Sequence, residues 1–247
     1  SYLVEGAKVF ISGGEHDLAE NIVHMVLARV EGAPPGVKGV SLFVVETDKV
    51  EGFRRGRKLK KLGQDAADTS ELFFDDVMLP ADNLLGGVEG LGFIQLMKEL
   101  PRERLVIAAM SMASIERALE ITIEYTRERK VFGKPLLDNQ VIHFRLAELK
   151  SEVEALRSIV YRACEDYLAG KDVTMLASMG KLKAGRLRRE VSDSCLQYWG
   201  GAGYLWDNPV ARGYRDGRLG SIGGGADEVM LQIISKLMGT LPRLGNR

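Results

Sequence analysis

The feature that most constrains the fold is a heptad pattern of apolar residues between residues 142 and 167. Apolar side chains recur there at alternating spacings of four and three residues, which is the period of a helix face that packs on other helices. The pattern predicts one long helix, and this helix ends at the stretch AGKD, residues 169–172. The positions that form the pattern are Ile142, Leu146, Leu149, Val153, Leu156, Val160, Ala163 and Tyr167.

Three further helical runs surround this one. They are predicted at residues 101–129, 173–199 and 226–238. Pro101 suits the first turn of its helix, where the missing N–H costs nothing, and the stretch GGAG at 200–203 ends the third run. Four helices with short connections predict an antiparallel four-helix bundle.

Residues 1–80 have a different period, with short runs rich in Val, Ile and Phe and no helical pattern. Loop signals such as EGAPPG at 31–36 separate them, so the runs are predicted to be strands. A turn is expected at Glu5-Gly6, within the first run. Strands followed by helices predict an α+β protein and exclude the alternating order of a Rossmann unit. The strand candidates are YLVEGAKVFIS, NIVHMVLARV, GVSLFVVE and SELFFDDVMLP.

The charge balance argues against nucleic acid as a partner. Thirty-four basic residues are cancelled by thirty-four acidic ones, whereas a general nucleic-acid binder carries a basic excess. The basic run RRGRKLKK at 54–61 is therefore predicted to be a solvated loop. No apolar run approaches the roughly 20 residues that a membrane-spanning helix needs.

The cysteines and histidines give no sign of a metal site. Cys164 and Cys195 lie in helical patterns without a CxxC motif, which predicts buried thiols in a reducing compartment. His16, His24 and His143 are scattered and match no metal-ligand spacing, so no metal is expected.

Two stretches could contribute to a ligand site. GGGADE at 223–228 precedes a helix, and free N–H groups at a helix start suit an anion or an oxygen that gains charge. On the pattern alone, a plain loop with Asp227 as a helix-start acid is the better interpretation. Glu103, between Arg102 and Arg104, is similar, because the helix dipole favours an acid in a first turn by about 0.3–1 kcal/mol. Spacing alone favours a structural role for Glu103.

Several longer stretches together resemble the acyl-CoA dehydrogenase family over essentially the whole chain. They are KVFIS at 8–12, KLGQDAADTSELFFDDVMLPADNLLG at 61–86, RERKVFGKPLLDNQ at 127–140 and CLQYWGGAGY at 195–204. GFIQLMKELPRERLVIA at 92–108 is most similar to the long-chain branch. The resemblance implies a partial β-barrel-like middle domain at 1–83 and a C-terminal bundle domain at 84–247. The N-terminal helical domain of the family and its first β-strands have no counterpart in this sequence.

The resemblance implies FAD-dependent oxidation of an acyl-CoA thioester to trans-2-enoyl-CoA. In the family a glutamate removes the α-proton while a hydride leaves Cβ for the flavin N5. The resemblance also implies a homotetramer, electron-transferring flavoprotein as electron acceptor, and a bacterial cytoplasm or a mitochondrial matrix as location. Two alternatives stay open: a non-catalytic truncated module that oligomerises or binds acyl-CoA without FAD, and a related flavoenzyme that reduces oxygen.

The resemblance also places the catalytic base. Most of the family carries the glutamate in the loop before the last helix, where this chain has Gly224. Long-chain and isovaleryl-type members take the base from the helix that begins ERL, and the matching residue is Glu103. Gly224 keeps the backbone N–H that holds the thioester carbonyl oxygen, and Arg104 matches an arginine near the CoA.

The remaining residues that match functional positions of the family concern FAD. Phe10 and Ser12 match flavin-wall positions, where the family often has Trp and Thr. Glu228 matches a polar FAD contact, and Ala226 stands at the position of a threonine that contacts FAD. Five residues match positions that contact FAD across a subunit interface: Arg129, Phe132, Gln140, Gln197 and Gly201.

Overall fold

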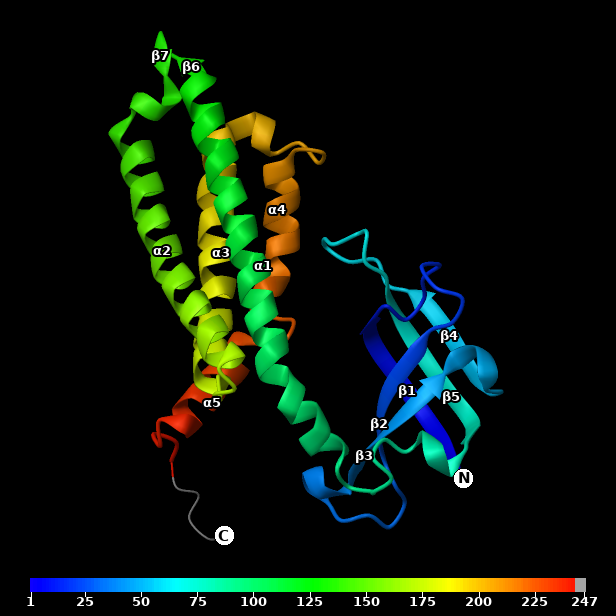
Figure 1. Cartoon of the computed structure of the whole chain (residues 1–247). Coiled ribbons are helices and arrows are strands. Elements are labelled where there is room, and N and C mark those ends of the chain that lie inside the picture. Colours follow the sequence, from blue (N-terminus) through cyan, green and yellow to red (C-terminus); the bar gives the residue numbers. More distant parts are fainter. Residues whose placement is uncertain (243–247) are drawn as a thin grey trace. The chain divides into compact units, whose positions relative to one another are not determined.

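The chain forms two compact units, Ser1–Glu99 and Leu100–Arg247 (Figure 1). Residues 1–242 are described in this computed structural model. Helix α1, Gly92–Glu128, begins in the first unit and continues into the second. The domain division expected between residues 83 and 84 stays a prediction, and the last five residues of its second domain lie outside those described.

The first unit is built from two antiparallel sheets. Strand β5 lies between β1 and β4 in one sheet, and β2 pairs with β3 in the other. The described strands form no closed barrel. The strands are β1 Tyr2–Ser12, β2 Val23–Arg29, β3 Val40–Glu46, β4 Phe53–Lys58 and β5 Thr69–Leu79, with short 3₁₀ turns at Gly36–Gly39, Thr47–Lys49 and Ala81–Asn83.

Two local predictions for this unit were wrong. The expected turn at Glu5-Gly6 is absent, because the register shifts between Val4 and Gly6 and this bulge lets β1 continue along β5. The basic run at 54–61 was predicted to be a loop, but its first five residues lie in β4. A strand at the sheet edge accommodates such charges, because its outer side is solvated.

The second unit contains the remaining helices. The α-helices that follow α1 are α2 Gln140–Leu168, α3 Thr174–Gly203, α4 Pro209–Gly217 and α5 Asp227–Leu237. A small hairpin, β6 Lys130–Val131 and β7 Lys134–Pro135, joins α1 to α2, and 3₁₀ turns lie at Leu136–Asp138 and Arg218–Ser221. The α+β class and the helical bundle are confirmed, and helix α4 adds to the four helices that were predicted. The signal for α4 was Asn208-Pro209, because the Asn208 side chain accepts a hydrogen bond from Val210 N–H and caps the helix.

The heptad pattern is confirmed as the buried face of α2. Its first seven positions are buried, and Leu149, Val153 and Leu156 are inaccessible to solvent. They pack in one core with residues of α1 and α3. Tyr167 is the exception at 42% exposed, because it lies in the last turn of the helix.

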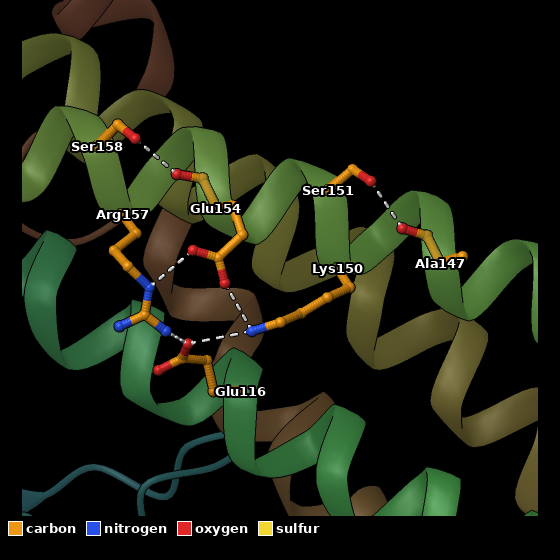
Figure 2. Close-up of polar contacts among 7 residues, drawn as sticks. All are labelled: Glu116, Ala147, Lys150, Ser151, Glu154, Arg157 and Ser158. Atoms are coloured by element: carbon orange, nitrogen blue, oxygen red, sulfur yellow. Dashed lines mark hydrogen bonds and ion pairs between the residues drawn. The ribbon is translucent and has the colours of Figure 1, made fainter.

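Ion pairs on the outer side join α1 to α2. Glu116 of α1 contacts Arg157 of α2 and lies 3.8 Å from Nζ of Lys150 (Figure 2). Glu154 bridges the same two cations, at 2.7 Å from Lys150 Nζ and 3.1 Å from Arg157 Nε. These ion pairs join the two helices, and the pair between Lys150 and Glu154 adds little to stability because both side chains are about half exposed.

The start of α1 corrects the sequence prediction. Pro101 was placed in a first turn, but the helix begins nine residues earlier, at Gly92. Pro101 is therefore an interior proline, which removes the hydrogen bond to the preceding turn. Leu100, one residue before it, begins the second compact unit. Glu103 consequently lies three turns into the helix, away from the dipole end that favours acids.

The two thiols differ in burial. Cys195 of α3 is fully buried, as predicted, and burial raises the pKa of its thiol to about 11. Cys164 of α2 is only partly buried. Within residues 1–242, no helix is long and apolar enough to cross a bilayer. In the same range, no group of three or more His, Cys, Asp or Glu side chains is placed to hold a metal ion.

Candidate active site

Glu103 and Gly224 come from distant parts of the chain, and the position of Ile107 shows how they lie relative to each other. Glu103 is exposed, and Ile107 follows it by four residues, on the same side of α1. A Cβ added to Gly224 would lie 2.4 Å from Cδ1 of Ile107. The side of α1 that carries Glu103 therefore faces the loop before α5.

The glycine loop has a backbone that side chains would disturb. Gly224 has φ +65° and Gly225 has φ +99°, and a Cβ on Gly225 would lie 2.7 Å from Cε of Met230. Only glycine takes such angles without strain. Within residues 1–242, no protein group accepts a hydrogen bond from Gly224 N–H. This N–H is therefore available to an oxygen from outside the chain.

Helix α5 begins directly after this loop, as predicted, and its first turn has no side-chain cap. Ala226 occupies the N-cap position and has no hydroxyl to accept a hydrogen bond from the first turn. Asp227 and Glu228 follow it, and both favour this end of the helix dipole. Asp227 is buried and its Oδ2 lies 3.3 Å from Nε of Arg186, whereas Glu228 is exposed.

Arg104 is buried although its neighbour Glu103 is exposed. It is 6% exposed, and its Nε has no hydrogen-bond partner within the described chain. Burial lowers the pKa of Arg104, and the charge of Glu103 partly offsets this effect. A buried guanidinium N–H without a partner is costly, so the site favours an incoming acceptor.

Lys181 is the residue that the sequence analysis missed. It lies on α3, is 0% exposed, and donates a hydrogen bond from Nζ to the carbonyl oxygen of Gly225. Burial lowers the pKa of Lys181, Arg104 lowers it further, and Asp227 and Glu228 oppose the shift. The sequence did indicate that Lys181 is buried. It follows Ala177 by four residues and precedes Ala184 by three, which places all three on the buried face of α3.

The five predicted interface contacts to FAD lie together at the other end of the bundle. Arg129 follows α1, Phe132 is at the tip of the β6–β7 hairpin, and Gln140 begins α2 (Figure 1). Leu136 N–H donates to the carbonyl oxygen of Arg129 at 2.7 Å, which closes this connection. These three residues therefore all lie in or beside the connection between α1 and α2.

Aromatic contacts join the end of α3 to the same place. The ring of Trp199 stacks on Tyr125 of α1, with centroids 4.0 Å apart, and its Nε1–H donates to Thr122 Oγ1 at 3.1 Å. Gln197 and Gly201 flank Trp199 and are both exposed. Gly200 has φ +58° inside α3, so the GGAG stretch kinks the helix where an end was predicted.

Two exposed aromatic residues have strained backbones. Phe10 in the first unit has φ +62° and is 77% exposed. Phe132 in the second unit has φ +53° and is fully exposed. A left-handed conformation at a bulky residue is costly and concentrates at functional sites. Both rings offer flat apolar area, which fits the expected contact with FAD. Ser12, two residues after Phe10, is also exposed.

Two family models together match most of the chain. The family model described as "Acyl-CoA dehydrogenase, middle domain" matches residues 1–77, and "Acyl-CoA dehydrogenase, C-terminal domain" matches residues 90–239. The long-chain specific acyl-CoA dehydrogenase of pig (Sus scrofa) mitochondria is 40% identical over 235 residues, which are 95% of this chain and 54% of that protein. Cyclohexane-1-carbonyl-CoA dehydrogenase of Geobacter metallireducens is 38% identical over 95% of this chain and 60% of its own length.

Solved structures show the same likeness. The crystal structure of acyl-CoA dehydrogenase from Geobacillus kaustophilus matches with a TM-score of 0.91 and 39% identity, over 96% of this chain and 61% of that one. The butyryl-CoA dehydrogenase of Megasphaera elsdenii matches with a TM-score of 0.89 and 36% identity, over 96% and 60%. The chain thus spans little more than half the length of the relatives it matches.

Proposed function

This chain belongs to the acyl-CoA dehydrogenase family, and from that premise we propose that the protein oxidises acyl-CoA thioesters to trans-2-enoyl-CoA with FAD. The observation that carries the proposal is the arrangement of Glu103 and Gly224. The loop before α5 has no carboxylate at residues 223–226, and the side of α1 that faces this loop carries one. The absence of a carboxylate at Gly224 and the presence of one at Glu103, on the facing side of α1, both support Glu103 as the base.

Each residue has a defined task in this chemistry. The Glu103 carboxylate accepts the α-proton, which is weakly acidic and needs a well-aimed base. The Gly224 N–H donates to the thioester oxygen as negative charge develops there. The buried Arg104 adds a positive field beside the carboxylate, and its unpartnered Nε–H suits the CoA end of the substrate. FAD, when bound, supplies the acceptor for the hydride that leaves Cβ.

We propose that a flavin site draws on two copies of the chain. The 25 residues of α1 from Arg104 to Glu128 span about 36 Å, at a rise of about 1.5 Å between successive residues. Residues expected to contact FAD lie at both ends of this span, namely Ala226 and Glu228 by the glycine loop and Arg129 and Phe132 beyond Glu128. A homo-oligomer, a tetramer in the family pattern, brings opposite ends of two copies together.

The Phe132→Asn variant tests the cofactor role without touching the base. Asn tolerates a left-handed backbone better than Phe does, and the Phe132 side chain is fully exposed. We expect the melting temperature of the cofactor-free protein to stay equal or rise, while the affinity for FAD falls about tenfold through loss of apolar contact. Flavin fluorescence titration measures the affinity, and Phe144→Asn, another exposed phenylalanine, is the control. An unchanged affinity for FAD would remove Phe132 from the site.

For the substrate, we propose a saturated long-chain acyl-CoA as the first candidate. The support is the 40% identity to the long-chain specific enzyme, and cyclic acyl groups are second because of the Geobacter relative. The proposed electron acceptor is electron-transferring flavoprotein. Rapid reoxidation of the reduced flavin by air would point to oxygen as acceptor.

The experiment is a visible spectrum of the protein with FAD, recorded without oxygen before and after addition of acyl-CoAs of several lengths. We expect the flavin band to bleach and enoyl-CoA to form in equal amount, fastest for long chains. Binding of acyl-CoA without any flavin in the protein would favour the non-catalytic alternative and overturn the proposal.

A further inference from the structure

Lys181 is a buried cation that the chemistry above leaves without a task. It is 0% exposed on α3, between apolar and small residues. A buried ammonium is costly unless it is paired and hydrogen-bonded. Its hydrogen bond goes to a backbone carbonyl of the glycine loop, not to a carboxylate. Lys181 therefore stabilises one conformation of that loop at a cost to its own hydration.

The contact is local to the turn that carries the free N–H. Lys181 Nζ donates to the carbonyl oxygen of Gly225, and its Cε lies 4.0 Å from where a Gly224 Cβ would be. Two adjacent glycines with positive φ have much conformational freedom to lose. Among the described residues, no other side chain donates a hydrogen bond to residues 223–226. Lys181 therefore restrains this loop by a hydrogen bond, whereas Ile107 and Met230 restrain it by packing.

Around the loop lie two buried cations, Arg104 and Lys181, and one buried acid, Asp227. Arg104 lies close enough to Lys181 to repel it, and both are buried. Asp227 and Glu228, at the start of α5, attract Lys181, but Asp227 is shared with Arg186 and Glu228 is exposed. Fixed buried cations beside an N–H donor favour charge that develops on an oxygen held there.

We propose that Lys181 is a positioning residue of the acyl-CoA site. Its bond to the Gly225 carbonyl fixes the Gly224–Gly225 turn so that Gly224 N–H is presented to the thioester oxygen, and its charge favours the enolate-like oxygen. This inference rests on the proposed function. It adds to that function Lys181 of α3, a residue that touches neither the substrate nor the flavin.

The first arm of the test needs no substrate. Lys181→Met replaces the cation by an apolar side chain of similar length, and Lys183→Met makes the same change on the same helix at a partly exposed lysine paired with Glu152. Within residues 223–226, Gly223 N–H is hydrogen-bonded, to the carbonyl oxygen of Leu219, and we expect its hydrogen exchange to become about tenfold faster in Lys181→Met, because the loop loses one stabilising hydrogen bond. Lys183→Met should leave it unchanged.

The second arm measures the oxyanion in the FAD-loaded protein without turnover. A 3-oxoacyl-CoA has an acidic α-proton, and the ultraviolet absorbance of its enolate reports its ionisation against pH. We expect the apparent pKa of the bound ligand to rise by about one unit in Lys181→Met, which is a tenfold change in its ionisation. Removal of a direct oxyanion donor costs about 10²–10³ in kcat, and Lys181 acts on the oxygen only indirectly, so its effect should be smaller. Lys181→Arg, which keeps a cation and donors, should recover part of the shift.

The outcomes separate this inference from the proposed function. Unchanged exchange at Gly223 N–H overturns the positioning role, whatever the protein binds. Faster exchange with an unchanged enolate pKa reduces Lys181 to a structural residue and also overturns it. If wild type binds no acyl-CoA, the proposed function fails, and with it the role at the oxyanion. The exchange arm then still decides whether Lys181 holds the turn.

Should Lys181→Met fail to fold, Lys181→Gln, which keeps a donor without the charge, replaces it in both arms.

Discussion

Glu103→Gln is expected to retain FAD and to reduce it with acyl-CoA at least about 10³-fold more slowly than wild type, within the range of general-base contributions. Glutamine keeps the size and shape of the side chain but cannot accept the α-proton. Glu103 is exposed in the described chain and makes no ion pair there that an amide would break. The melting temperature should therefore change little. Stopped-flow absorbance of the flavin under anaerobic conditions measures the rate.

The control for this variant is Glu124→Gln, at another exposed glutamate of α1. It removes one negative charge from the same helix, far from the glycine loop. We expect wild-type reduction rates in this control. Full-speed reduction in Glu103→Gln would show that another group takes the α-proton, and the base would then have to be sought elsewhere.

The second large effect concerns moving the base to the loop. Glu103→Ala should lose activity as Glu103→Gln does, and adding Gly224→Glu supplies a carboxylate from the opposite side. Two obstacles are visible. A glutamate at φ +65° costs about 1–2 kcal/mol, and its Cβ would meet Cδ1 of Ile107. Ile107→Val deletes that methyl group.

The triple variant Glu103→Ala, Ile107→Val, Gly224→Glu is therefore expected to recover at least about tenfold of the activity that Glu103→Ala loses, a part of what a general base contributes. The version without Ile107→Val should recover less. Gly224→Gln in the same background controls for the shape of the new side chain. Equal rates for the Glu and Gln versions would mean that the pocket does not take a base from the loop.

The buried face of α2 was predictable because one helix surface repeats every seven residues. Leu149, Val153 and Leu156 follow that period, so their burial could be read without knowing their partners. The start of α1 was not predictable in this way. Proline at a first turn is a statistical preference, and the preceding residues from Gly92 extend the helix despite it. The wrong helix start had a consequence for Glu103, because it placed this residue in a first turn and so favoured a structural role for it.

The site was only partly predictable for a related reason. Glu103 and Gly224 are 121 residues apart in the sequence, and no local pattern places them on facing surfaces. Their pairing came from the resemblance, and the position of Ile107 against Gly224 gives it a physical basis. Lys181 was missed because a lysine between helical alanines is usually solvent-exposed. Its burial depends on the loop that packs over it.

The most direct test of the central claim follows proton removal alone. Acyl-CoA is incubated in D₂O, without oxygen, with protein whose FAD has been chemically reduced beforehand, so that no hydride can be accepted. Mass spectrometry then counts deuterium at Cα. We predict deuterium uptake with wild type and with Glu124→Gln, and a rate at least about 10³-fold lower with Glu103→Gln. Equal uptake by wild type and Glu103→Gln would contradict the assignment of Glu103 as the base.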